Sequence, residues 1–519
     1  MRVADRTVGP DRPTQTIKFH AIERTTLAEI LSLPGPLFIG AGDPWRQLHY
    51  VDGYVRHPTL GCRTVVLEEH YIDRDHMEDH SVFYSKNLRQ YPNSCQRLHF
   101  FSLNERNLKA QIKRLQSLAV QSSSTKAEFG AACAKFSQSY YLGFSVIKPL
   151  PGCPVGRTVI RCLSPESGKG HRRLFPCAFD YTVHVFGLPL TVFGLAFQQQ
   201  DLGVSACATT ALWTSLQNAR QLEQSGFATP AQITIRASQF TLPFGRPMPS
   251  PGLSLDQMCQ AIQSLGYSPS LYRTEATEDA FSVSLALLHS AISSGISPVL
   301  VMSLQGMNTR HAVAVAGMAM APGEGLTRSK VGHVSADMIA LYIHDDRNGP
   351  YMKAEIGQQN TRLQLHLQMQ GEKTQVWTLT HVLIPMHGKI RLSFRGLYQA
   401  GLEIFPVIQA FLESSLRLDP STTSWSSRIL RAHSYLEGLL RHGRITLANR
   451  LYNSVALPRY VGVLHVEAPS LKPFDILIDT TSTERNVNYL GLIQLEKDET
   501  NTNSLCERIA QDLACLTLV

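Results

Sequence analysis

Residues 198–213 read QQQDLGVSACATTALW, a short polar turn followed by the start of a helical pattern. Gly203 and Ser205 favour the turn, and the apolar residues after Cys207 keep a helical spacing, which predicts that one helix face packs into a core. Cys207 would then lie in the first turn of the helix. Because a helix N-terminus stabilises negative charge, this position favours the thiolate, the nucleophilic form of cysteine. The stretch therefore predicts a cysteine nucleophile.

The chain supplies a base and an orienting carboxylate further along. His311 opens a strand of small and β-branched residues 104 residues after Cys207, and Asp345 ends another apolar strand 34 residues later. In such a site the cysteine attacks, the histidine exchanges a proton with it, and the carboxylate sets the imidazole tautomer. Asp346 is the alternative orienter. Because neighbours on a strand point to opposite faces, we expect only one of the two aspartates to face His311.

These segments resemble those of papain-like cysteine peptidases, and in particular the bacterial branch that includes the double-glycine leader peptidases. The resemblance covers roughly residues 180–390. It is carried by the segments QQDLGVSACATTAL, GLSLDQM leading to LGY, RHAVAVAG, and YIHDD followed by GPY. It differs where the papain signature Cys-Gly-Ser-Cys-Trp and the leader-peptidase step Asp-Cys-Gly are replaced; the latter is Asp201-Leu202-Gly203 here. We therefore place the nucleophile at Cys207.

The resemblance implies a papain-like core, in which the helix carrying the nucleophile packs on an antiparallel sheet. It implies Cys207, His311 and Asp345 as the catalytic triad. The oxyanion donors would be the backbone N–H of Cys207 and a glutamine amide. We assign the amide to Gln200 because it lies nearer the papain spacing, with Gln199 as the alternative.

A chain of 519 residues exceeds a single core, and its patterns predict an α+β protein with flanking α+β regions. We expect helices at 397–416 and 427–440, and late strands at 460–466 and 474–478. The predicted organisation is a flexible N-terminus (1–18), an N-terminal α+β domain (19–140), the papain-like core (141–395), and a C-terminal α/β subdomain or extension (396–519).

Composition limits the other function classes. The formal net charge is +8, but the basic residues are spread along the chain, so there is no specific nucleic-acid signal. The most apolar run, 183–197, is too short and too interrupted for a membrane span. The ten cysteines are irregularly spaced, which favours reduced thiols in a cytoplasmic protein. No Walker or Gly-x-Gly-x-x-Gly motif is present, so no cofactor is predicted.

A second cluster of polar residues lies at 70–80. It contains His70, Asp73, Asp75, His76, Asp79 and His80. On a helix His76 and His80 form an i,i+4 pair, a geometry that suits a transition metal. The same density of charge equally suits a solvated helix, and there is no His-Glu-x-x-His motif, so no metal is assigned.

The sequence as a whole predicts a bacterial cysteine peptidase or isopeptidase that hydrolyses a protein or peptide substrate through a thioester. Three alternatives stay open: acyl transfer of the transglutaminase type with the same triad, a papain-like binding module with an idle triad, and a metal-dependent hydrolase centred on residues 70–80. Loops 243–251 and 306–310 are candidates for the walls of a substrate cleft.

Overall fold

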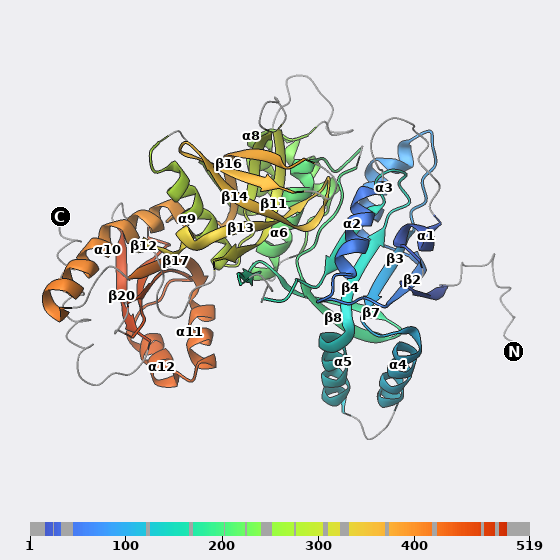
Figure 1. Ribbon diagram of the computed structural model, residues 1–519, viewed down its shortest axis with the longest axis horizontal. Helices are drawn as coiled ribbons and strands as arrows, with labels where there is room; N and C mark the ends of the chain where they lie inside the picture. Colours follow the sequence, from blue (N-terminus) through green and yellow to red (C-terminus); the bar gives the residue numbers. More distant parts are fainter. Residues whose placement is uncertain are drawn as a thin grey trace, which may run out of the picture.

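The computed structural model shows an α+β protein built from antiparallel sheets, as predicted (Figure 1). Residues 16–23, 25–32, 45–120, 125–165, 170–201, 203–223, 226–239, 252–274, 277–304, 310–321, 332–368, 373–417, 423–468, 472–482 and 487–495 are described. In Figure 1 the first and last sheets lie at opposite ends of the molecule, on either side of a central sheet.

The first sheet is an antiparallel meander in which sequence neighbours are also sheet neighbours. Its strands are β1 (Ile17–Ala21), β2 (Thr64–Tyr71), β3 (Cys95–Phe101), β4 (Tyr141–Ile147) and β5 (Val155–Ile160). Both faces are buried: Val65 belongs to one apolar core and its neighbour Val66 to the other. This explains why β2 has three consecutive apolar residues, Val65, Val66 and Leu67, rather than an alternating pattern.

Helices cover the two faces of this sheet. On the face of Val65 lie α1 (Leu27–Leu31) and α2 (Arg46–Val55), and on the face of Val66 lie α4 (Glu105–Val120) and α5 (Lys126–Tyr140). The short helices α3 (Arg74–Val82) and η1 (Tyr84–Lys86) follow β2.

Two predicted boundaries differ from this arrangement. The expected domain border at residue 140 falls inside the first sheet, because β4 pairs with β3 and β5 pairs with β4. The expected loose segment 1–18 overlaps β1, which begins at Ile17 and pairs with β2; residues 1–15 lie outside the described part.

The central sheet closes on itself. Its strands are β10 (Val299–Leu304), β11 (Arg310–Met320), β13 (Met338–Asp345), β14 (Gly349–Gln359), β15 (Arg362–Leu367) and β16 (Gln375–His387). They pair in that order, and β16 pairs back onto β10, so the strands form a closed barrel. Two further strands attach at its sides: β9 (Tyr267–Arg273) to β16 and β6 (Arg172–Leu174) to β11.

Helices pack around the barrel, and a β-ribbon packs on α5 and on β4 and β5 of the first sheet. They are the ribbon β7 (Phe179–Val185) and β8 (Leu188–Gly194), and the helices α6 (Cys207–Glu223), α7 (Pro230–Ala237), α8 (Leu255–Ser264) and α9 (Ala280–Ser293). Helix α6 packs on β11 and is buried over most of its length. It shares one apolar core with α8 and with Ala312 and Ala314 of β11, so the nucleophile candidate lies on a helix that is held by the barrel.

The last sheet is linked to the barrel by a two-residue strand, β12 (Gly332–His333), which belongs to the chain segment between two barrel strands. Its other strands are β17 (Ser424–Arg431), β18 (Tyr460–Glu467), β19 (Phe474–Asp479) and β20 (Asn488–Gln494). Helix α10 (Phe394–Leu416) packs on β17, on the face of the last sheet that is turned to the barrel. Helices α11 (Ala432–Arg441) and α12 (Ile445–Ser454) share a separate small core with the opposite face of the same sheet. The strand β12 comes from the barrel segment and pairs parallel with β17.

The predicted helix at 427–440 is wrong in its first part. Residues 427–431 belong to β17, and the helix begins only at Ala432. Trp425 and Ile429 are buried in the large core, and the strand pairs along its length with β18. Burial and strand pairing therefore override the local helical pattern. Within the described ranges, no helix combines the length and apolar character that a membrane span requires.

Candidate active site

The turn before Cys207 is organised by Asp201. Its Oδ1 accepts hydrogen bonds from the backbone N–H groups of Gly203, Val204 and Ser205 at 2.9, 2.7 and 2.9 Å. Its Oδ2 lies 3.5 Å from Nζ of Lys148, and both side chains are buried. Burial by itself would raise the pKa of Asp201, but Lys148 and these N–H groups hold it below its usual range. The ionised Asp201 thus shapes the turn that leads into α6.

Gly203 of this turn also packs against the ring of Phe83, which lies in the N-terminal part of the chain. A Cβ on Gly203 would lie 2.3 Å from Cε1 of Phe83, the residue between α3 and η1. Glycine is therefore required by space at this position. The contact fixes where α6 begins, and with it the position of Cys207, which is its first residue.

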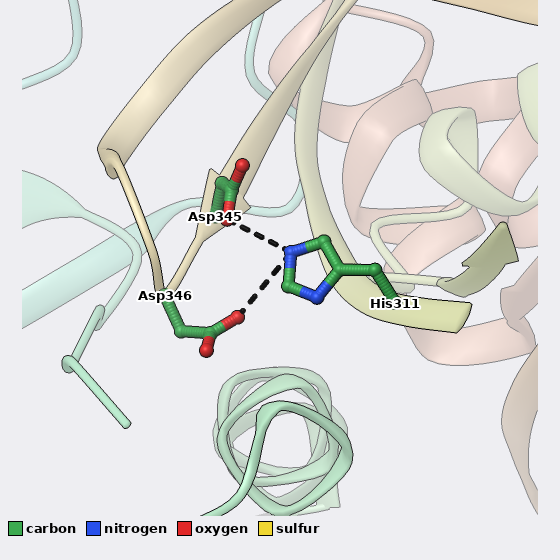
Figure 2. A group of neighbouring side chains, drawn as sticks. All are labelled: His311, Asp345 and Asp346. Atoms are coloured by element: carbon green, nitrogen blue, oxygen red, sulfur yellow. Dashed lines mark hydrogen bonds and ion pairs between the residues drawn. The ribbon is translucent and has the colours of Figure 1, made fainter. Parts of the chain in front are cut away.

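His311 and Asp345 come together as predicted. The His311 ring donates from Nε2 to Oδ1 of Asp345 at 2.9 Å (Figure 2), and both side chains are buried. Asp345 also accepts the backbone N–H of Arg347 at 3.0 Å and the Nδ2–H of Asn348 at 2.6 Å. Burial opposes ionisation of Asp345, but His311 and these donors lower its pKa below the usual range. The carboxylate is thereby fixed in one orientation.

Asp346 faces the same imidazole, contrary to the expectation that only one aspartate would. Its Oδ1 lies 3.6 Å from Nε2 of His311, and Figure 2 shows both carboxylates converging on that nitrogen. The strict alternation of a strand ends at Asp345, the last residue of β13, so Asp346 belongs to the turn and points back to the same side. Neither oxygen of Asp346 has a hydrogen-bond partner among the described residues. Burial raises the pKa of Asp346 to about 7, and the negative charge of Asp345 adds to this effect.

The Cys207 side chain acts on His311 without a hydrogen bond among the described residues. The Nδ1 of His311 points away from the two aspartates and has no hydrogen-bond partner among the described residues. Burial lowers the pKa of His311, but Asp345, the side chain of Cys207 and Asp346 raise it to about 10. The thiol is thus one of the groups that favour the protonated imidazole, and Nδ1 is the ring nitrogen left for it. Contacts between catalytic groups tighten when substrate is bound in many enzymes.

The two glutamine candidates differ in what their amides do. The Gln199 side chain accepts the backbone N–H of Val155 at 3.2 Å and donates to the carbonyl of Gly152 at 3.1 Å. It is buried and holds the start of β5. Gln200 is half-buried, and its side chain forms no hydrogen bond with the described residues. Of the two, Gln200 alone has an amide that is free to donate.

Sequence reasoning did not find three residues that hold this site. Asn348 fixes Asp345, and Lys148 pairs with Asp201. The indole of Trp377 on β16 packs on the His311 ring with centroids 5.5 Å apart. The turn after Asp345 was a signal for Asn348. Lys148 directly follows β4 and Trp377 lies on β16, both far from Cys207 in the sequence, so neither left a local signal.

Hydrogen bonds occupy much of the cluster at 70–80, although one oxygen of Asp75 and Nδ1 of His76 have no partner among the described residues. Asp73 caps α3 by accepting the N–H groups of Asp75 and His76, and it pairs with Arg157 at 2.5 Å. The two imidazoles each bond a backbone carbonyl: His76 that of Pro92 and His80 that of Tyr91. Among the described residues, the side chains whose ligand atoms converge as a metal would require are instead those of His311, Asp345 and Asp346.

Comparisons with protein-family models, with curated proteins and with solved structures found no match to this chain. The chemistry of the site is therefore inferred from its own geometry. Loop 243–251 and residues 306–309, the expected cleft walls, lie outside the described residues.

Proposed function

We propose that this chain is a cysteine peptidase or isopeptidase with a papain-like core, in which Cys207, His311 and Asp345 form the triad. One observation carries the proposal. Asp345 binds Nε2 of a buried His311, which leaves Nδ1 as the nitrogen available to the thiol at the start of α6. A nucleophile, a base and a group that orients the base are the parts that acyl transfer through a thioester needs.

The proposed reaction follows from these positions. The thiol proton passes to Nδ1 of His311, and Sγ of Cys207 attacks the carbonyl carbon of the scissile amide. The oxyanion that forms accepts hydrogen bonds from the backbone N–H of Cys207 and from the Gln200 amide. Nδ1 then donates its proton to the departing amine, and a thioester remains.

The second half of the reaction uses the same groups. Nδ1 of His311 removes a proton from water, the hydroxide attacks the thioester carbon, and the thiol is restored. Asp345 stays ionised throughout and stabilises the imidazolium. An amine in place of water would give acyl transfer with the same residues.

The proposal is tested by labelling with iodoacetamide at mildly acidic pH and mapping the product by mass spectrometry. An ordinary thiol titrates near pH ~8.5 and reacts slowly there, whereas a thiolate paired with imidazolium reacts fast. We expect fast labelling at Cys207 alone in the wild type, and slow labelling in His311→Ala.

Cys259 on α8 serves as the internal control. It is the other described cysteine that is partly exposed, and burial raises the pKa of its thiol. If Cys207 reacts no faster than Cys259, or if its rate ignores His311→Ala, the triad is idle and the binding-module alternative replaces the proposal. Hydrolysis of peptide substrates must also be lost in Cys207→Ala while its circular dichroism spectrum is unchanged.

A further inference from the structure

Two carboxyl groups lie at Nε2 of His311, and the triad uses only one of them. Asp345 is satisfied by His311, Arg347 and Asn348, but Asp346 is 3 % exposed and both its oxygens lack a hydrogen-bond partner among the described residues. Ionising a buried carboxyl group without a hydrogen-bond partner is costly, and proteins keep such a group protonated, pair it with another charge or bind it to a metal. The proposed peptidase reaction gives Asp346 no task.

We propose that Nε2 of His311, Oδ1 of Asp345 and an oxygen of Asp346 bind a divalent cation of the zinc class. The three ligand atoms lie within 4.8 Å of one another. Nε2 is 2.9 Å from the oxygen of Asp345 and 3.6 Å from that of Asp346. Two ligands at about 2.1 Å from a tetrahedral ion are about 3.4 Å apart, so small shifts of the side chains would place them around one ion.

The surroundings of the three ligands favour such an ion. Asn348 and the backbone N–H of Arg347 hold Asp345 from outside the site, and Trp377 packs on the ring of His311. Groups of this kind orient metal ligands in known sites. Two carboxylates and a neutral imidazole also balance the charge of a divalent cation. Imidazole and carboxylate together suit zinc and neighbouring transition ions.

Binding at this position would compete with the proposed triad. The ion takes the place of the proton on Nε2 of the neutral imidazole, that proton moves through solvent to Nδ1, and the bond between His311 and Asp345 is replaced by two metal–ligand bonds. The single ring proton then lies on Nδ1, so the imidazole cannot accept the proton of Cys207. This consequence depends on the proposed function, whereas the binding itself does not.

The test measures zinc bound per chain without an activity assay. Protein treated with a chelator is dialysed to equilibrium against buffered zinc, and the bound metal is determined by elemental analysis. We expect one tightly held zinc per chain in the wild type and in Cys207→Ala. Asp346→Asn, which keeps the shape of the side chain, should weaken zinc binding at least about tenfold.

Asp75→Asn is the matched control. Asp75 is also buried with an unpartnered oxygen, but it lies in the cluster at 70–80. Zinc binding that is lost in Asp75→Asn, or lost in Cys207→Ala, or unchanged in Asp346→Asn overturns the proposal. The absorption spectrum of the cobalt-loaded protein gives a second readout: a sulfur-to-cobalt charge-transfer band would place the ion at Cys207 instead. Labelling of Cys207 that fails to depend on His311 would end the peptidase proposal and leave this one standing.

Discussion

At the scale of single residues, the site depends on which side chains are already committed to the backbone. Gln199 and Gln200 are adjacent and chemically identical, yet only Gln199 is bonded to Val155 and Gly152. An amide that is already hydrogen-bonded to a strand is not available to donate to the oxyanion that forms during the reaction. The same distinction separates Asp345, whose oxygens accept hydrogen bonds, from Asp346, whose oxygens accept none from the described residues.

The two glutamines should therefore respond differently to alanine. Gln200→Ala should lower kcat by about 10²–10³ with little change in stability, because a single oxyanion donor is lost. Gln199→Ala should lower the free energy of unfolding by about 1–3 kcal/mol, because the N–H of Val155 loses its partner in a buried place. Steady-state kinetics on a peptide substrate and urea unfolding of both variants measure the two effects. An unchanged kcat in Gln200→Ala would remove this residue from the oxyanion site.

At the scale of elements, the position of α6 is set from outside the helix. Asp201 shapes the turn before it, Gly203 lets that turn approach Phe83, and packing on β11 fixes the helix axis. At its other end Glu223 pairs with Arg431 at 2.6 Å and Arg459 at 2.8 Å from the last sheet. The helix is thus held at both ends by different parts of the chain.

Gly203→Ala should disturb the start of α6. The added methyl group would lie 2.3 Å from the ring of Phe83, so the turn or the ring must move. Overpacking of this kind costs about 1–3 kcal/mol. We expect a lower free energy of unfolding and slower iodoacetamide labelling of Cys207.

The double variant Gly203→Ala/Phe83→Ala is the control for that contact. Removal of the ring opens the space that the methyl group needs, so the cost of Gly203→Ala should largely disappear when it is measured in the Phe83→Ala background. If the double variant loses as much free energy of unfolding as the two single variants together, Gly203 is needed for a reason other than its contact with Phe83.

At the scale of the whole molecule, the last sheet carries a charge cluster that makes stability depend on pH. His465 of β18 bonds Asp475 of β19 at 2.6 Å and Glu467 at 3.2 Å, and Tyr435 of α11 donates to the same Asp475. Burial lowers the pKa of His465, but the two carboxylates raise it to about 9. The cluster lies in the middle of the sheet that is joined to α6 through Glu223.

The sign of the pH effect follows from this raised pKa. Between the unfolded value of about 6.5 and the folded value of about 9, the folded chain binds more protons than the unfolded chain. The contribution of His465 is therefore complete below about pH 6.5 and is lost as the pH rises through about 9. We expect the free energy of unfolding to fall by about 1–3 kcal/mol across that window on account of this residue.

The measurement is urea unfolding at a series of pH values for the wild type and for His465→Gln. Other groups titrate in the same range, so the quantity to compare is the difference in the free energy of unfolding between the wild type and His465→Gln at each pH. That difference should shrink as the pH rises from 6.5 to 9.5. A difference that is constant with pH would show that His465 is not protonated in the folded chain.

Sequence patterns alone were enough to determine the local parts of this protein. Periodicity correctly assigned the helix that begins at Cys207, the strand that begins near His311 and the strand that ends at Asp345. It also indicated the α+β class. These features depend on residues within a few positions of one another, which is the range over which helix and strand periods act.

Only the tertiary structure decided what depends on pairing between distant segments. The register of β11 on β13 brings His311 to Asp345, and the turn after β13 turns Asp346 to the same side. Lys148 reaches Asp201 from the first sheet, and burial of Trp425 and Ile429 made a strand of residues expected to be helical. Such contacts join residues far apart in the chain, and their energies come from packing and charge rather than from any local pattern.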